Sequence, residues 1–148
     1  YHIIYNETLR DRVCAVSDKT HHNEMNVLSM HALIGAYQPQ GYEWVDELNQ
    51  VLAGNIEYFC DYVDEHFEGV SYSRPQGTYM VFLDCTEWCR EHGRDIQWLL
   101  DEGARVGVGY QDGRPFHGPC HIRVNLALPL SRVREACDRL DRYVFNAR

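Results

Sequence analysis

The sequence has 148 residues, of which 45% are hydrophobic, and this is enough for one domain with a packed core. Its formal net charge of −8 argues against a nucleic-acid-binding protein, because such proteins usually present a basic patch. No apolar run approaches the roughly 20 residues that cross a bilayer, and no signal peptide is recognisable, so we expect a cytoplasmic protein that binds no membrane. The 6 cysteines are irregularly spaced and are interpreted as free thiols.

Helices dominate the predictions for the first half of the chain. Asn6 is placed to cap a helix that ends near Lys19, because its side chain can accept a hydrogen bond from the first turn. A second helix is expected over residues 26–37. The third, over residues 42–67, has apolar residues at steps of three or four, the period of a helix with one buried face. Residues 1–5 are apolar and β-prone, but at this position they would make a poor isolated strand.

The second half of the chain alternates between short strands and short helices. The predicted strands cover residues 70–73, 78–83, 105–109 and 121–128. Pro75 and Gly77 mark a turn between the first two strands. Thr86 and Asp95 are candidate N-caps of two short helices, and Ser131 is the candidate cap of the last helix. We therefore predict an α+β fold, with a small, largely antiparallel sheet that helices cover on one face.

The last predicted strand carries an arginine at its centre. Side chains alternate along a strand, so Ile122, Val124 and Leu126 share one face, while Arg123 and Asn125 share the other. The planar guanidinium suits a carboxylate, which it can hold with two parallel hydrogen bonds. The pattern alone leaves two alternatives, a structural ion pair with an acid of this chain or an anchor for a ligand, and it favours the ion pair.

Residues 107–129 read Gly-Val-Gly-Tyr-Gln-Asp-Gly-Arg-Pro-Phe-His-Gly-Pro-Cys-His-Ile-Arg-Val-Asn-Leu-Ala-Leu-Pro. This run resembles the C-terminal signature of fold-type I pyridoxal-phosphate enzymes, the class I/II aminotransferases and their relatives. Its wording is most similar to the cystathionine β-lyase (cysteine C–S lyase) branch. The resemblance extends over the whole chain and is strongest in residues 74–84 and 103–129.

The resemblance implies roles for particular residues. In the family, an arginine at the position of Arg123 binds the α-carboxylate of an amino-acid substrate, and Asn125 would lie beside it. Tyr110 would line the mouth of the substrate pocket, although ordinary packing is an equal alternative for its side chain. The full-length enzyme would be a cytoplasmic homodimer. His22 and Asn23 would reach the active site of the neighbouring subunit, although a solvated loop with a helix cap at Asn23 is an equal alternative.

The resemblance also implies that the sequence is part of a larger enzyme. Residues 1–45 would be the end of the large cofactor-binding domain, and residues 46–148 would be the small C-terminal domain. The family's cofactor lysine lies upstream of the matched region. Lys19 is the only lysine here, and its polar surroundings do not suggest the desolvated pocket that such a lysine needs. We therefore expect no catalytic or cofactor-binding residue in this chain, no productive binding of pyridoxal phosphate and no activity without the missing N-terminal domain.

The sequence gives weaker support to other chemistries. Cys85 and Cys89 could pair with His117, Cys120 and His121 around a zinc ion, but these residues fall in different helix and strand patterns. A Cys120–His121 nucleophile pair is disfavoured because adjacent strand residues point to opposite faces. A third alternative is a non-catalytic amino-acid-binding module. The residues do not distinguish a C–S β-lyase from an aminotransferase.

Overall fold

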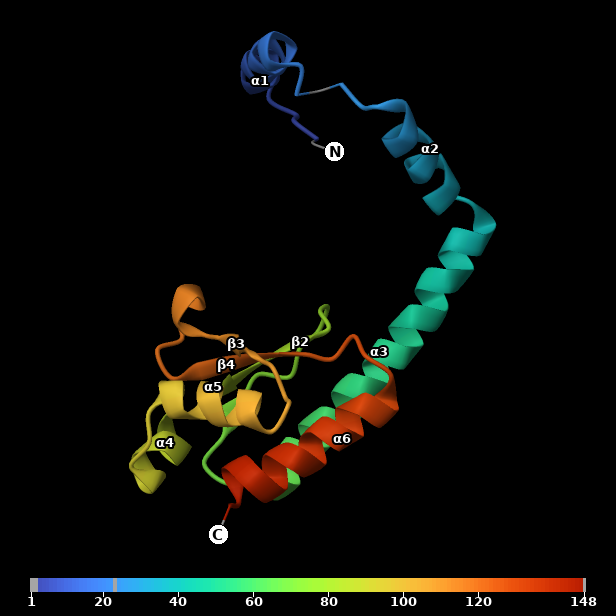
Figure 1. Ribbon diagram of the computed structural model, residues 1–148. Helices are drawn as coiled ribbons and strands as arrows, with labels where there is room; N and C mark the ends of the chain where they lie inside the picture. Colours follow the sequence, from blue (N-terminus) through green and yellow to red (C-terminus); the bar gives the residue numbers. More distant parts are fainter. Residues whose placement is uncertain (1–2, 23, 148) are drawn as a thin grey trace. The chain divides into compact units, whose positions relative to one another are not determined.

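The structure is a computed structural model that describes residues 3–22 and 24–147. The chain divides into two compact units, Tyr1–Asp46 and Glu47–Arg148. The division lies inside one continuous helix, α3 (Pro39–His66), which Figure 1 shows in cyan and green. Within the described residues, no helix combines the length and the apolar composition that a membrane span requires.

The first unit contains two further helices, α1 (Glu7–Thr20) and α2 (Val27–Ala36). Each begins after an asparagine whose side-chain oxygen accepts a backbone N–H of the first turn at 2.9 Å, Asn6 for α1 and Asn26 for α2. Asparagine is a preferred N-cap because it satisfies a donor that the helix itself leaves free. The cap predicted at Asn6 is therefore confirmed.

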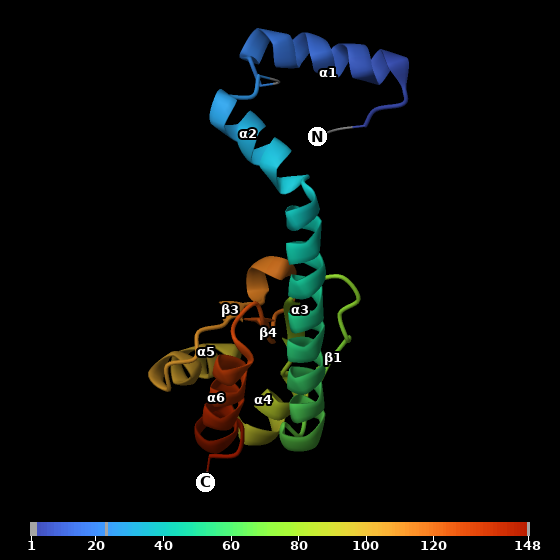
Figure 2. The same ribbon diagram turned by 90° about the vertical axis from the view of Figure 1, so that its right-hand side faces the viewer.

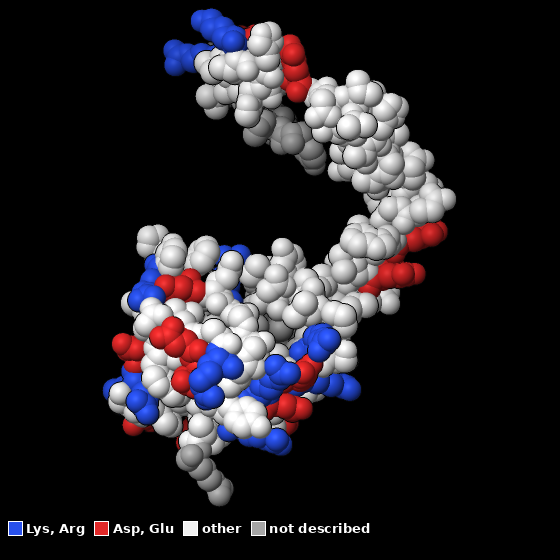
Figure 3. Space-filling view, in the orientation of Figure 1, with Lys and Arg blue, Asp and Glu red and all other residues white. Residues whose placement is uncertain are grey.

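The β-prone run at residues 1–5 forms no strand over the residues that the structure describes, as expected of a run without a pairing partner. Ile3–Tyr5 forms no regular element, since no described segment pairs with it, and residues 1–2 lie outside the described part. No described residue between 3 and 46 is buried. The large apolar side chains of α2 are exposed, and Leu28 is the most exposed of them at 83%. Helix α2 appears entirely white in Figure 3 because it carries no Lys, Arg, Asp or Glu.

The second unit is built on a four-stranded antiparallel sheet in the order β1-β2-β4-β3. Its strands are β1 (Ser71–Tyr72), β2 (Met80–Asp84), β3 (Gln111–Asp112) and β4 (His121–Asn125). The central pair, β2 and β4, sets Phe82 opposite Arg123, and β3 sets Gln111 opposite Arg123 from the other side. The predicted small antiparallel sheet is confirmed.

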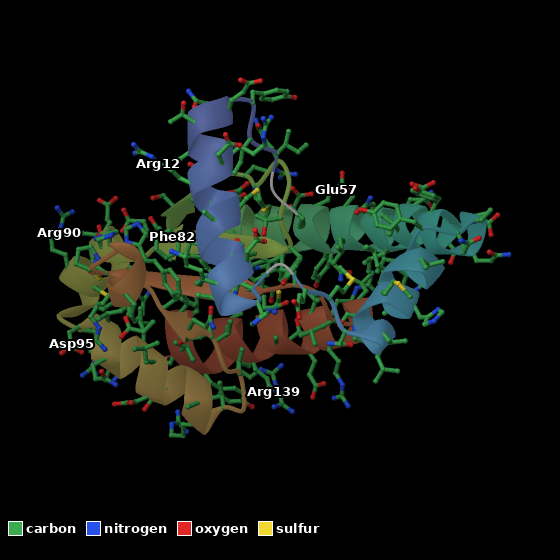
Figure 4. The ribbon with its side chains drawn as sticks, turned by 90° about the horizontal axis from the view of Figure 1, so that it is seen from above. Arg12, Glu57, Phe82, Arg90, Asp95 and Arg139 are labelled. Atoms are coloured by element: carbon green, nitrogen blue, oxygen red, sulfur yellow. The ribbon has the colours of Figure 1, made fainter. Side chains whose placement is uncertain are left out.

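Helices cover one face of this sheet. They are α3, α4 (Thr86–His92), α5 (Ile96–Arg105), α6 (Leu130–Leu140) and a short π-helix η2 (Asp141–Phe145). Their buried side chains form one core with Val81, Leu83, Ile122 and Val124 of the sheet. Figures 1 and 2 show α6 running alongside the C-terminal half of α3. The α+β fold with its helices on one face is therefore confirmed, and so is the predicted cap at Asp95, which Figure 4 labels at the start of α5.

Asn55 joins α3 to the chain that leaves β4. It is 1% exposed, and its amide nitrogen donates to the carbonyl oxygens of Leu126 and Leu128, each at 2.8 Å. A buried polar side chain is tolerated when its hydrogen bonds are made. Here the two bonds satisfy carbonyls beyond the last residue of the sheet, and they fix the direction in which the chain exits β4.

The strand predicted for residues 105–109 is wrong. Helix α5 continues to Arg105, and the chain then turns through Gly107, whose φ of 77° is readily available only to glycine. The N–H of Val108 bonds back to the carbonyl of Gly103 at 2.8 Å. These residues therefore close the end of a helix, and the strand that pairs with β4 is the later Gln111–Asp112.

Two predicted boundaries also move. The strand predicted to reach residue 128 ends at Asn125, because the next carbonyls turn toward Asn55. The last helix begins at Leu130, with Pro129 at its N-cap, so Ser131 lies inside the helix and does not cap it. The cap predicted at Thr86 is wrong as well, because Thr86 is the first residue of α4 and Cys85 is at the N-cap; the Thr86 N–H donates to the Asp84 carboxylate at 2.9 Å.

Candidate functional site

Arg123 lies at the middle of β4, on the sheet face turned away from the core. It is half-buried, and its neighbours Ile122 and Val124 point into the core. The Arg123 Nε–H donates to the sulfur of Met80 at 2.9 Å. Its guanidinium carbon lies 4.4 Å from the ring centre of Phe116, which belongs to a short 3-10 helix, η1 (Arg114–Phe116).

No carboxylate among residues 3–22 and 24–147 forms an ion pair with Arg123. Asp112, on the adjacent strand, is already engaged, because its carboxylate holds the Arg114 guanidinium at 2.7 Å. The structural ion pair favoured by the sequence pattern is therefore wrong for the described residues. A half-buried guanidinium that lacks a carboxylate partner among the described residues can bind the carboxylate of a ligand.

The surroundings of Arg123 are weakly polar. Met80 and Phe116 contact it directly, and Phe82 lies opposite it on β2, where Figure 4 labels that side chain. Phe82 in turn packs against His121, with ring centres 4.6 Å apart. Charged hydrogen bonds are stronger where water is partly excluded, so this setting favours tight binding of a carboxylate.

Asn125 is exposed on β4, two residues beyond Arg123 and on the same face of the strand. Its side-chain oxygen accepts the N–H of Ala127 at 2.8 Å. This contact turns the amide oxygen toward its own backbone. The amide nitrogen makes no hydrogen bond within the described chain and is available as a second donor near Arg123.

Tyr110 lies differently from the two β4 residues. Its ring packs against the core, and its hydroxyl donates to the carbonyl of Leu99 in α5. Burial raises the pKa of this hydroxyl, with smaller contributions from nearby acidic groups. A Cβ at Gly103 would overlap the Tyr110 ring, so this close approach requires glycine. The hydroxyl is thus engaged within the chain, and a role for Tyr110 in substrate binding stays a prediction.

Replacing Tyr110 by phenylalanine should lower the free energy of unfolding by about 0.5–1.5 kcal/mol, because the Leu99 carbonyl loses its hydrogen-bond donor. Urea unfolding followed by circular dichroism measures the change. Tyr143→Phe is the matched control, since Tyr143 is 47% exposed. Equal stability of the two variants would show that the Tyr110 hydroxyl bond contributes nothing.

The predicted residues of the neighbouring-subunit site belong to the first unit. His22 is exposed in the turn after α1, and its N–H donates to the carbonyl of Ser17 at 3.1 Å. Asn23 lies outside the described residues. The exposed ring of His22 leaves its predicted role open.

Among the described residues, the one lysine does not lie in a setting that suits a covalent bond to a cofactor. Lys19, the only lysine of the sequence, is exposed in the last turn of α1. Solvent surrounds it, whereas a lysine that holds a cofactor covalently needs a desolvated setting. The zinc alternative also lacks support, because no group of three or more His, Cys, Asp or Glu in the described part of the chain could hold a metal ion.

Met80 and Phe116 were missed by reasoning from the sequence. Both contact Arg123, yet Met80 lies 43 residues before it in the chain. The signal for Met80 is the pairing of β2 with β4, because alternation then sets Met80 and Phe82 on the face of Arg123. For Phe116, the signal is an exposed aromatic residue in the loop that precedes the arginine strand.

No protein-family model matches the sequence. Among curated proteins, one from Mycobacterium leprae named "Putative cystathionine beta-lyase" is 35% identical over 124 residues, which are 73% of this chain and 30% of that protein. A Mycobacterium tuberculosis protein of the same name is 32% identical over 128 residues, with the same coverage. An aspartate aminotransferase of a Bacillus species is 28% identical over 142 residues, 90% of this chain and 35% of the relative.

Solved structures of pyridoxal-phosphate-bound enzymes share the fold of this chain. The pyridoxal-phosphate-bound C–S lyase from Staphylococcus hominis matches 94% of this chain and 36% of its own length, with a TM-score of 0.77 and 25% identity. The structure of a Clostridium difficile protein described as a "PLP-bound putative aminotransferase" matches 94% of this chain and 35% of its own, with a TM-score of 0.81 and 22% identity. The chain thus spans about a third of the length of the relatives it matches.

Proposed function

We propose that this chain belongs to the fold-type I pyridoxal-phosphate-dependent enzymes and corresponds to their C-terminal part. The function proposed below rests on this premise. In the full-length enzyme, Arg123 binds the α-carboxylate of an amino-acid substrate. The reaction is the β-elimination of a C–S lyase. The observation that carries the proposal is the half-buried Arg123 guanidinium without a carboxylate partner among the described residues.

The role of this chain is to bind and orient the substrate. Arg123 offers two parallel N–H donors to the carboxylate, and Asn125 offers a further amide donor on the same face. Fixing the carboxylate restricts rotation about the bond to Cα, which holds the Cα–H bond in one direction and lowers the entropy lost on reaching the transition state. The cofactor of the family supplies an electron sink at Cα, and no residue described here holds it.

The same proposal assigns parts of the chain to domains. Residues 1–45 belong to the end of the large cofactor-binding domain, and residues 46–148 form the small domain. Two observations support this assignment: the match covers only 30% of the Mycobacterium leprae relative, and no described residue between 3 and 46 is buried. The chain alone is inactive because it lacks the cofactor lysine. The full-length enzyme is a homodimer in which His22 and Asn23 approach the neighbouring active site.

The lyase is favoured over an aminotransferase by the more similar relatives. The two mycobacterial proteins named for cystathionine lyase activity are 32–35% identical to this chain, whereas the aspartate aminotransferase is 28% identical. An aminotransferase is the second candidate, supported by that relative. Both reactions need the same carboxylate anchor, so Arg123 does not distinguish them.

Product analysis of the full-length enzyme tests the reaction. With L-cystathionine and no keto acid, we expect pyruvate, ammonia and a thiol in equal amounts, because β-elimination breaks the Cβ–S bond and needs no amino acceptor. L-Alanine, which has no leaving group on Cβ, is the control and should give none of these products. Amino transfer that requires a keto acid and releases no ammonia would instead assign the aminotransferase. Binding of amino acids without either reaction would assign a non-catalytic module.

A further inference from the structure

Met80 holds the Nε atom of the Arg123 guanidinium. The Nε–H of Arg123 donates to the Met80 sulfur at 2.9 Å, and within the described residues neither Nη group of Arg123 makes a hydrogen bond. A guanidinium can bind a carboxylate with paired donors along two edges, one formed by Nε and one Nη, the other formed by both Nη groups. Because the sulfur engages Nε–H, only the edge with both Nη groups keeps all of its donors.

The position of Met80 is fixed by the sheet. Met80 is the first residue of β2 and pairs with Asn125 of β4, so it lies diagonally across from Arg123 on the same face. The N–H of Leu126 donates to the carbonyl of Tyr79 at 2.9 Å and continues this pairing by one step. A contact between paired strands keeps its geometry better than a contact from a loop. The Met80 sulfur is therefore a fixed support for the Arg123 side chain.

The Met80 sulfur directs the guanidinium without cancelling its charge. A thioether is a neutral and weak acceptor, whereas an aspartate or glutamate at this position would pair with Arg123 and compete with a ligand. The second contact of Arg123 is of the same kind, because the Phe116 ring, 4.4 Å from the guanidinium carbon, is uncharged. Two neutral side chains thus restrict the orientation of Arg123, and its positive charge stays available to a ligand.

We propose that Met80 is a positioning residue for substrate binding, because its sulfur engages Nε–H and leaves the two Nη groups of Arg123 for the substrate carboxylate. The proposal rests on the function proposed above, in which Arg123 binds that carboxylate. Two parallel hydrogen bonds then run from Nη1 and Nη2 to the carboxylate oxygens. Met80 does not touch the substrate and acts through Arg123. The carboxylate held in this way lies in the plane of the guanidinium, and this geometry fixes the direction of the bond to Cα.

Binding of two matched amines to the full-length enzyme tests this role. 2-Aminoisobutyrate carries the α-carboxylate but has no Cα–H bond, so neither elimination nor amino transfer can start. Isopropylamine is the same molecule without the carboxylate. Leucine is close to methionine in volume but accepts no hydrogen bond. Met80→Leu should therefore raise the Kd of 2-aminoisobutyrate, measured by titration calorimetry, by roughly two- to ten-fold and leave that of isopropylamine unchanged.

Further variants separate orientation from charge and from packing. Met80→Gln supplies an amide oxygen on a side chain of similar length, so it should raise the Kd of 2-aminoisobutyrate less than Met80→Leu does. Met80→Glu supplies a carboxylate that pairs with Arg123, so it should raise this Kd by roughly thirty-fold or more. In the Arg123→Ala background, Met80→Leu should have no further effect, because the two residues act through one contact. Cofactor absorbance and urea unfolding show whether each variant is folded.

The role of Met80 and the proposed function can fail separately. If Arg123→Ala leaves the Kd of 2-aminoisobutyrate unchanged, or if the wild-type enzyme does not bind this amino acid, the proposed function is overturned and the role of Met80 with it. If Arg123→Ala weakens binding but Met80→Leu does not, only the role of Met80 is overturned. Equal weakening of both amines by Met80→Leu, or the same loss in the Arg123→Ala background, has that consequence too. Should Met80→Leu not fold, equal Kd values for Met80→Gln and Met80→Glu would contradict an effect through Arg123.

Discussion

Replacing Arg123 by alanine in the full-length enzyme is expected to lower kcat/KM for the amino-acid substrate by roughly thirty-fold to several-thousand-fold. Truncating one partner of a desolvated, charge-assisted pair costs on the order of 2–5 kcal/mol, and each 1.4 kcal/mol corresponds to about a factor of ten. Arg123 is half-buried beside Met80 and Phe116, so the pair that it forms is shielded from water. The loss should appear largely in kcat/KM, because a loosely held substrate also misorients its Cα–H bond.

Steady-state kinetics and the absorbance of the bound cofactor measure this effect together. The absorbance should stay normal in Arg123→Ala, since Arg123 binds substrate and not cofactor in this proposal. Arg123→Lys keeps the charge but loses the planar fork, so it should restore activity only in part. Phe116→Leu removes the cation–π contact with Arg123, which is worth about 0.5–2 kcal/mol, and should therefore lower kcat/KM by roughly two- to thirty-fold. Unchanged kcat/KM in Arg123→Ala would mean that another residue binds the carboxylate.

Replacing Asn55 by alanine should destabilise the second unit more than any exposed substitution on α3. The two hydrogen bonds from its amide nitrogen to Leu126 and Leu128 are both 2.8 Å long, and the side chain is 1% exposed. Leaving a buried acceptor without a donor costs about 1–3 kcal/mol, so the loss of both bonds should lower the free energy of unfolding by roughly 2–6 kcal/mol.

Urea unfolding of the two α3 variants Asn55→Ala and Asn49→Ala measures this difference. Asn49 is exposed on the same helix, so its replacement controls for the change in helix propensity. Asn55→Asp should also be destabilising, because the substitution removes the donor and sets a carboxylate against two carbonyl oxygens. If Asn55→Ala were as stable as Asn49→Ala, the link between α3 and the exit of β4 would not contribute to the fold.

Short sequence patterns correctly predicted features that depend on neighbouring residues, namely two helix caps and the alternation of side chains along a strand. Asn6 and Asp95 cap helices where their side chains suggested, and alternation along residues 122–126 correctly separated the core face of β4 from the face of Arg123. Residues 105–109 were wrongly predicted to form a strand, because their alternating Val and Gly residues fit the period of a strand. What decides their structure is the turn at Gly107 and the distant anchor of Tyr110 on Leu99, neither of which a short pattern reveals.

The candidate site, too, was only partly predictable from the sequence. Arg123 could be identified from its central position in a strand and from the surrounding run of residues. The absence of a carboxylate partner in the part of the chain that the structure describes could not be predicted, because the sequence contains 22 acidic residues and gives no distances between side chains. The contacts with Met80 and Phe116 depend on strand register and on the path of a loop, which form only when distant segments pair.

The exposure of α1 and α2 has a consequence for amide hydrogen exchange. These helices have 14 and 10 residues, and none of their residues is buried. Unpacked helices of this length are marginal in water, so their amide protons should exchange with deuterium nearly as fast as those of an unfolded peptide. Amides of β2 and β4 should exchange only through opening of the whole core. Along α3, protection should rise from its exposed first turns to Phe59, so that one continuous helix would contain both kinetic regimes.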